Sequence, residues 1–350
     1  MKARAGVGYA FGAASVFGCS TPFAKRLGDG VSPQVFAGLL YLGSGLGLAA
    51  TLLIFPSGGR ESSLQKADRG PLFLAVVFGG MLGPLLLMIG LRTTPAATTA
   101  LLLNLEAVFT ALGAWLVVKE HADRRIVIAM MIIVAGGVLL SINPSGGFAI
   151  TAGAMAIVGA CACWGVDNVA TRPLGLRDPR QVGAVKGVFA GTANLGIGLV
   201  AGGHLPRLSI IAGAVVLGFF GYGLSLVLYI KALRVLGIAR TGAYYAAAPF
   251  FGAGIALVWL REPVGRMFVP AVGLMAIGLA IHLTERHRHD HAHIALTHAH
   301  RHVHADIHHL HTTDDNDAPV DEAAHADVHT HATTQHDHDH TPDEHHIHEH

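Results

Sequence analysis

Charged residues are scarce in this chain of 350 residues: Asp, Glu, Lys and Arg make up 13% of it, against about 25% in an average soluble domain. Hydrophobic residues make up 52%, and the mean hydropathy is +0.49. This balance excludes a soluble globular protein, because so few charges cannot cover a surface in water. The composition predicts a chain that crosses a lipid bilayer several times.

Cysteine and catalytic motifs are also sparse. The three cysteines, Cys19, Cys161 and Cys163, lie within apolar runs and form no pattern typical of a disulfide framework. The sequence contains no phosphate-binding loop, no H-E-x-x-H zinc motif and no motif of a Ser-His-Asp hydrolase. We therefore expect no enzyme, no required cofactor and no nucleic-acid partner.

Long apolar runs fill the first 286 residues instead. A helix needs about 20 mostly apolar residues to cross the hydrocarbon core of a bilayer, and charges, Pro or Gly separate ten such runs. The expected fold is therefore all-α, with ten transmembrane helices. The expected spans are 6–25, 33–55, 71–91, 96–118 and 125–142, followed by 149–171, 181–202, 209–230, 238–260 and 266–284.

Two of these runs are related by a fixed offset. One ends in Lys119-Glu120 and the other, 142 residues later, ends in Arg261-Glu262. Such repetition indicates a duplicated unit of five spans. Because five is an odd number, the two halves insert with opposite orientations, as an inverted repeat. The segments that align are 101–120 with 243–262, and 17–27 with 164–174.

The duplicated unit resembles the EamA-type repeat of the drug/metabolite transporter superfamily. A typical helix of that repeat opens with an acidic residue and proline and closes with glutamate. Here the first copy runs from Glu106 to Glu120 with Ala107 at the proline position, and the second copy has Pro249 and Glu262. The resemblance covers most of the chain outside the C-terminal tail. It implies a secondary transporter that exports a small metabolite or drug-like solute.

Basic residues favour one side of the expected bundle. With the N-terminus inside, 16 Lys and Arg residues fall on the inner side and 6 on the outer side. The positive-inside rule then places both termini in the cytoplasm, in a multi-pass protein of the cell (inner) membrane. The expected partners are the lipid bilayer and a small-molecule substrate, and the sequence leaves a homo-oligomer open.

Three charged side chains lie inside expected spans, where charge is costly and usually faces a bundle interior or a cavity. Glu106 is either a proton-titrating or solute-binding carboxylate, or a packing group that is bonded to a neighbouring helix. Asp167 and Lys186 are expected to pair, either for transport or for structure alone. The other cavity candidates are amide or aromatic side chains: Asn104, Asn168, Trp164, Tyr244 and Tyr245.

Histidine is concentrated in residues 287–350, which hold 21 of the 24 histidines. They recur as His-x-His with Asp and Glu between them and no aromatic residues, so we expect a disordered cytoplasmic tail. Neutral imidazole and carboxylate groups suit divalent metal ions such as Zn, Ni, Co or Cu. The expected metal ligands are His287, His289, His291, His293, His298, His300, His302, His304, His336, His338 and His340.

Three functions fit these features. The first is a solute transporter in which the repeats 1–142 and 149–286 alternate access to a midplane cavity, coupled to protons or to exchange. The second is a divalent-metal transporter, although a metal site in the membrane would have to combine Cys163, Asp167 and Glu106. The third is a membrane-anchored metal buffer or sensor, for which ten spans are more than an anchor needs.

Overall fold

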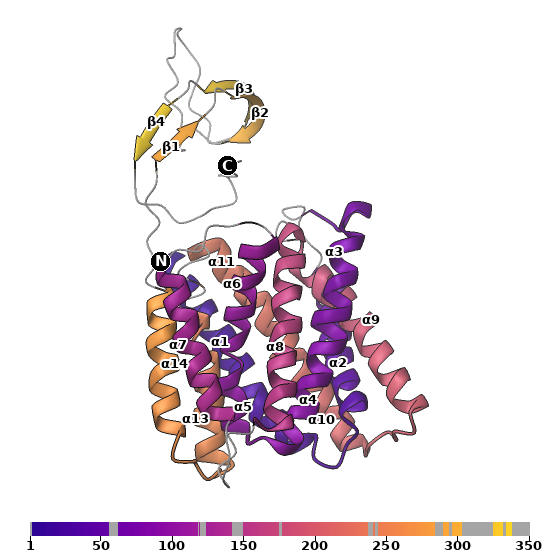
Figure 1. Ribbon diagram of the computed structural model, residues 1–350. Coiled ribbons are helices and arrows are strands. Elements are labelled where there is room, and N and C mark those ends of the chain that lie inside the picture. The colour runs from indigo at the N-terminus through magenta and orange to yellow at the C-terminus, as the bar shows by residue number, and fades with distance from the viewer. Residues whose placement is uncertain are drawn as a thin grey trace. The chain divides into compact units, whose positions relative to one another are not determined.

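The protein is described here by a computed structural model, whose helical unit and smaller tail unit are separate compact bodies. Figure 1 shows both units. The residues that the structure describes are 2–55, 62–117, 119, 124–141, 150–174, 177–236, 241, 244–283, 290–293, 296–302, 325–331 and 334–337.

The first half of the helical unit contains five helical spans, one of which includes a π-helix, η2. Its elements are α1 (Lys2–Leu27), α2 (Pro33–Ile54), η1 (Lys66–Asp68), α3 (Arg69–Leu74), η2 (Ala75–Leu82), α4 (Gly83–Thr93), α5 (Ala96–Leu102), α6 (Leu105–Val117) and α7 (Arg124–Ser141).

The second half repeats this order, and its π-helix is η4. Its elements are α8 (Ala152–Thr171), η3 (Arg172–Leu174), α9 (Pro179–Val200), α10 (Leu208–Gly218), η4 (Phe219–Leu224), α11 (Ser225–Leu236), α13 (Ala248–Trp259) and α14 (Phe268–Leu283).

Apolar helices of membrane-spanning length dominate this unit. Six stretches in the described chain are long and apolar enough to cross a bilayer, and three shorter apolar helices accompany them. The prediction of an all-α, multi-pass membrane protein is therefore confirmed. The six long stretches are Pro33–Ile54, Lys66–Thr93, Ala96–Val117, Ala152–Leu174, Pro179–Val200 and Leu208–Ala232.

The first helix of each half packs against the other half. α1 lies against α11 and α13, whereas α8 lies against α4 and α6. In addition, α2 packs on its counterpart α9, and α7 packs on α14. Exchanging the two halves leaves this set of contacts unchanged, so the packing has the pseudo-two-fold symmetry typical of internally repeated transporters. The two halves are thus interlocked.

Glycine makes the contact between α2 and α9 possible. A Cβ atom on Gly187 of α9 would overlap the backbone of Gly45 in α2, and a Cβ atom on Gly45 would overlap Gly187 and Val188. Small residues let helix backbones approach closely in lipid, where van der Waals packing holds helices together. The contact between α2 and α9 therefore depends on the absence of these side chains.

The tail unit contains two antiparallel strand pairs in its described parts. β1 (Asp290–His293) pairs with β4 (Thr334–Asp337), and β2 (Leu296–His302) pairs with β3 (His325–His331). The sequence predicts no regular structure here, so these strands are a difference from that expectation. The strands are short and each sheet has only two of them, and isolated two-stranded sheets are at best marginally stable.

Replacing Gly187 by alanine tests the packing of α2 on α9. We expect Gly187→Ala to lower stability by ~1–3 kcal/mol, the usual cost of overpacking. Gly196→Ala, on the same helix, is the matched control. Among the described residues, no atom lies within 4 Å of a Cβ placed on Gly196. Thermal unfolding in detergent micelles checks this. Equal melting temperatures for the two variants would contradict the tight α2–α9 contact.

Candidate functional site

The fourth span of each half is interrupted at matching positions. A turn at Leu103 and Asn104 separates α5 from α6, and a turn at Ala246 and Ala247 precedes α13. The repeat offset of 142 aligns Asn104 with Ala246. The sequence predicts one continuous helix at each place, so the interruptions correct that prediction. Discontinuous helices line many transporter binding sites near the midplane. Glu106 lies in the first turn of α6, directly after the interruption.

Glu106 is bonded to α8 in the other half of the molecule. Its Oε1 accepts a hydrogen bond of 2.9 Å from Asn168 Nδ2, which also donates to Thr110 Oγ1 at 3.0 Å. The carboxyl group interacts electrostatically with the hydroxyl groups of Tyr229 and Tyr245. Asn168 is exposed and Glu106 is half-buried. Among the described residues, no basic side chain forms an ion pair with Glu106.

Asp167 and Lys186 form an ion pair that joins α8 to α9, the pairing that the sequence suggests. Their side chains are 8% and 17% exposed. Lys186 Nζ binds Asp167 Oδ2, while the buried Oδ1 has no hydrogen-bond partner within the described chain. Pairing offsets much of the cost of placing both charges in the interior.

Gly79, which packs on this ion pair, has a carbonyl group without a helical partner. In η2 the N–H of Gly83 bonds to the carbonyl of Phe78, as the wider π-helical turn requires. The corresponding donor for the carbonyl of Gly79 would be residue 84, which is Pro84 and has no N–H. The carbonyl of Gly79 must therefore be satisfied from outside its helix.

Two aromatic side chains satisfy this carbonyl. Tyr41 Oη donates to Gly79 O at 2.7 Å, and Trp164 Nε1 donates to it at 3.0 Å. Gly79 also packs directly on the ion pair, since a Cβ atom there would overlap the charged groups of Asp167 and Lys186. Tyr41 and Gly79 were not among the sequence candidates. The sequence does contain an indication of this site, because Pro84 follows Gly79 at the spacing of a π-helical hydrogen bond and has no N–H to donate.

An asparagine of α9 completes the polar groups around η2. Asn194 Nδ2 donates to the carbonyls of Gly80 and Met81, at 3.3 and 3.2 Å. At the repeat offset of 142, η4 falls on residues 77–82 and therefore inside η2. The two halves thus share the π-helical geometry, but only η2 is followed by proline at the matching position.

Aromatic rings connect the two halves beside this site. Phe17 contacts Tyr222 and Tyr245, with ring centroids 6.1 and 5.8 Å apart. Tyr222 also contacts Tyr41 at 5.5 Å, and Tyr245 contacts Tyr229 at 4.7 Å. Tyr245, a sequence candidate, therefore belongs to a cluster that reaches from Tyr41 to the surroundings of Glu106.

Two other candidates have their described contacts elsewhere. Tyr244 packs on Phe11, with ring centroids 5.1 Å apart. Asn104 is buried, and its Nδ2 donates to the carbonyl of Leu101 at 3.0 Å and lies 3.9 Å from the sulfur of Met275. The sequence groups Asn104 with Glu106, but the described contacts of Asn104 stabilise the turn between α5 and α6.

The expected metal ligands divide into two groups. His291, His293, His298, His300, His302 and His336 lie on the described strands. His287, His289, His304, His338 and His340 lie outside the described residues.

Neutralising one or both members of the ion pair tests its energetic role. We expect Asp167→Asn or Lys186→Met alone to lower stability by ~3–5 kcal/mol, because each leaves an uncompensated buried charge or polar group. The double variant should recover most of this loss, since no charge is then stranded. Thermal unfolding followed by tryptophan fluorescence checks both. Single variants at least as stable as the double variant would contradict the pairing.

Comparison with known proteins adds to this geometry. The EamA-like transporter family matches residues 4–142 and again residues 151–284. An uncharacterized transporter of Methanothermobacter thermautotrophicus is 29% identical over 219 residues, which are 60% of this chain. The match spans 63% of that relative's length.

A solved crystal structure supports the fold. It superimposes with a TM-score of 0.58 at 18% identity, over 79% of this chain and 95% of the other. At this identity the likeness concerns the fold alone. With two matches that together cover most of its length, the chain belongs to the EamA-like transporter family.

Proposed function

We propose that the protein is a secondary transporter that moves a small metabolite or drug-like solute by alternating access of its two repeats. One observation carries this proposal: the polar site at Glu106 combines side chains from both halves. Glu106 comes from the first half, and its hydrogen-bond donor Asn168 comes from the second. A rocking motion of one half against the other would remodel such a site, and could expose a bound solute to each side in turn.

The roles of the charged groups follow from their partners. Glu106 is bonded to a neutral donor, so its carboxylate is available to a proton or to a positively charged group of the solute. Asp167 and Lys186 neutralise each other and hold α8 to α9. In the proposed mechanism Glu106 is the coupling residue, and Trp164, Tyr245 and the ion pair shape its surroundings.

The proposed orientation places both termini in the cytoplasm. It rests on the excess of Lys and Arg, 16 against 6, on the side of the N-terminus. The end of the bundle where α1 meets α2 then faces away from the cytoplasm.

Divalent metal ions as the transported solute are the alternative, and the interior argues against them. Asp167 is paired with Lys186 and not with Glu106 and Cys163. In the part of the chain that the structure describes, no group of three or more His, Cys, Asp or Glu is arranged to hold a metal ion. A metal buffer or sensor is the third reading, and it would leave the interior site of the helical unit without a function.

We also propose that the tail binds divalent metal ions such as Zn, Ni, Co or Cu. Its 21 histidines within residues 287–350 supply many neutral nitrogen ligands. The strand register adds to this, because His298 is paired with His329 and His302 with His325.

Replacing Glu106 by glutamine tests the transport site. Glu106→Gln preserves the shape of the side chain but removes its charge, so we expect transport to be abolished while the protein still inserts into the membrane. Mass spectrometry would compare the intracellular and extracellular solutes of cells that produce wild type, Glu106→Gln and the charge-preserving Glu106→Asp. Wild-type transport by Glu106→Gln would remove this residue from the mechanism.

Ending the chain at Arg286 separates the tail from the core. We expect the shortened protein to accumulate in the membrane, to remain folded and to lose most metal binding. Cellular Ni, Co and Zn would be measured for the full chain, the shortened chain and Glu106→Gln. If the shortened chain changes cellular metal and Glu106→Gln cancels that change, metal is the substrate. A shortened chain that fails to accumulate would give the tail a structural role.

A further inference from the structure

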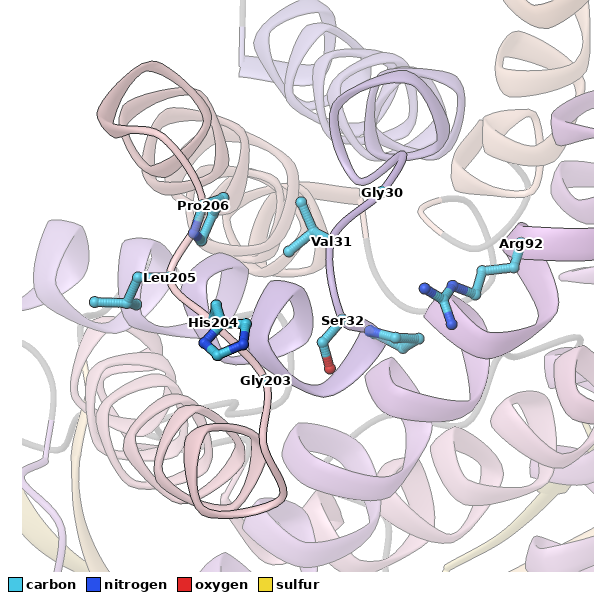
Figure 2. A pocket seen from close by; sticks show the side chains of 9 residues that line it. Gly30, Val31, Ser32, Arg92, Gly203, His204, Leu205 and Pro206 are labelled. Atoms are coloured by element: carbon cyan, nitrogen blue, oxygen red, sulfur yellow. The ribbon is translucent and has the colours of Figure 1, made fainter.

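Two pockets open at the end of the helical unit where α1 ends and α2 begins. One has a volume of about 380 Å³, and Figure 2 shows Arg92 and His204 in its lining. The other, of about 500 Å³, shares Arg92 with the first and is also lined by Lys25, Asp29 and Glu262. Glu262 is half-buried and its carboxylate borders this open pocket.

Glu262 connects the two repeats at this end. Its Oε1 and Oε2 accept hydrogen bonds from the backbone N–H groups of Ala96 and Ala97, both 2.8 Å long. These amides begin α5 in the first half, whereas Glu262 follows α13 in the second half. Ionised acceptors make hydrogen bonds that are about twice as strong as neutral ones. The carboxylate thus holds the first half to the second.

The backbone before Glu262 is arranged for this contact. Arg261 has a φ of 52°, in the left-handed region that residues other than glycine rarely adopt. Lys119, which aligns with Arg261 at the repeat offset of 142, has a φ of 60°. Such a conformation persists only where surrounding contacts hold it. Directly after Arg261, the described contact is the pair of hydrogen bonds that Glu262 accepts from the start of α5.

Lys25 holds the other side of the same turn. Its ammonium group donates to the carbonyls of Leu91 and Thr94, at the end of α4. It also interacts electrostatically with Glu262 and Asp29. The turn between α4 and α5 is therefore held by α1 from its own half and by Glu262 from the other half. Of these two polar contacts, only that of Glu262 crosses between the repeats.

Beneath this turn the helices are close-packed. Ala96, Ala97 and Ala100 of α5 are buried together with Ala253 and Ala256 of α13. Opening this end would separate α5 from α13, and the two bonds of Glu262 would have to break. Because Glu262 is half-buried and borders a pocket, water could take over those bonds when they break.

We propose that Glu262 is a gating residue, whose bonds to the start of α5 close this end of the transport pathway and are released when it opens. The proposal rests on the alternating-access function proposed above. Glu262 does not touch the transported solute in this scheme. It positions the two repeats in the closed state of this end.

Thiol labelling of the full-length protein in proteoliposomes tests the gate without a known solute. Ala97→Cys, 2% exposed beneath Glu262, is labelled with a membrane-impermeant maleimide in a Cys19→Ser, Cys163→Ser background. Cys161 is retained as a reporter of folding, because its side chain is fully buried. Adding Glu262→Gln should raise labelling of position 97 about tenfold, the size of effect expected for a lost helix cap, with Cys161 still protected.

Two further variants complete the test. Asp29→Asn removes an equal charge from the same pocket, where Asp29 makes no described hydrogen bond, and should leave labelling unchanged. Glu262→Asp retains the carboxylate and should restore most of the protection. Unchanged labelling in Glu262→Gln, an equal rise in Asp29→Asn, or a parallel rise at Cys161 would each overturn the gate. Failure of the proposed transport function would appear instead as wild-type transport by Glu106→Gln, with the labelling result unaffected.

Discussion

A backbone carbonyl or amide inside a membrane needs a partner within the protein, and this constraint orders the described helices. Pro84 removes the donor that the carbonyl of Gly79 would otherwise have. Tyr41 and Trp164 replace it, so α2 and α8 are both bonded to η2. Asn194 does the same from α9. Two of these helices, α8 and α9, also carry the ion pair, and α8 carries the donor to Glu106.

The same need is met differently at the end of the bundle. There Lys25 donates hydrogen bonds to the carbonyls at the end of α4, and Glu262 accepts hydrogen bonds from the first amides of α5. The contacts around Gly79 are buried between helices, whereas Glu262 borders a pocket. Buried contacts of this kind are costly to break, while contacts beside water can be exchanged. The contacts around Gly79 are therefore suited to holding the helices together, and the end is suited to a reversible closure.

Much of the fold could be predicted from the sequence, because apolar length and a repeat offset are direct consequences of the bilayer and of duplication. The pairing of Asp167 with Lys186 was also accessible, since consecutive spans usually pack together. The interruption at Asn104 was not, because residues 101–117 are apolar enough to read as one helix. Nor was the bond from Asn168 to Glu106, which joins residues 62 apart through a packing arrangement that periodicity does not contain.

The partners of Glu106, Asp167 and Lys186 show which of these three interior charges is best suited to coupling. In the interior of the described spans lie two carboxylates and one ammonium, and Lys186 is bonded to Asp167. Opposite charges in contact leave little net field, so this pair contributes mainly to holding α8 and α9 together. Glu106 accepts a hydrogen bond from the amide of Asn168, which stabilises its carboxylate without neutralising it. In a medium where unpaired charge is costly, its negative charge is the one that a proton or a cationic group would balance. Within the proposed mechanism, Glu106 is therefore the residue at which solute and proton would compete.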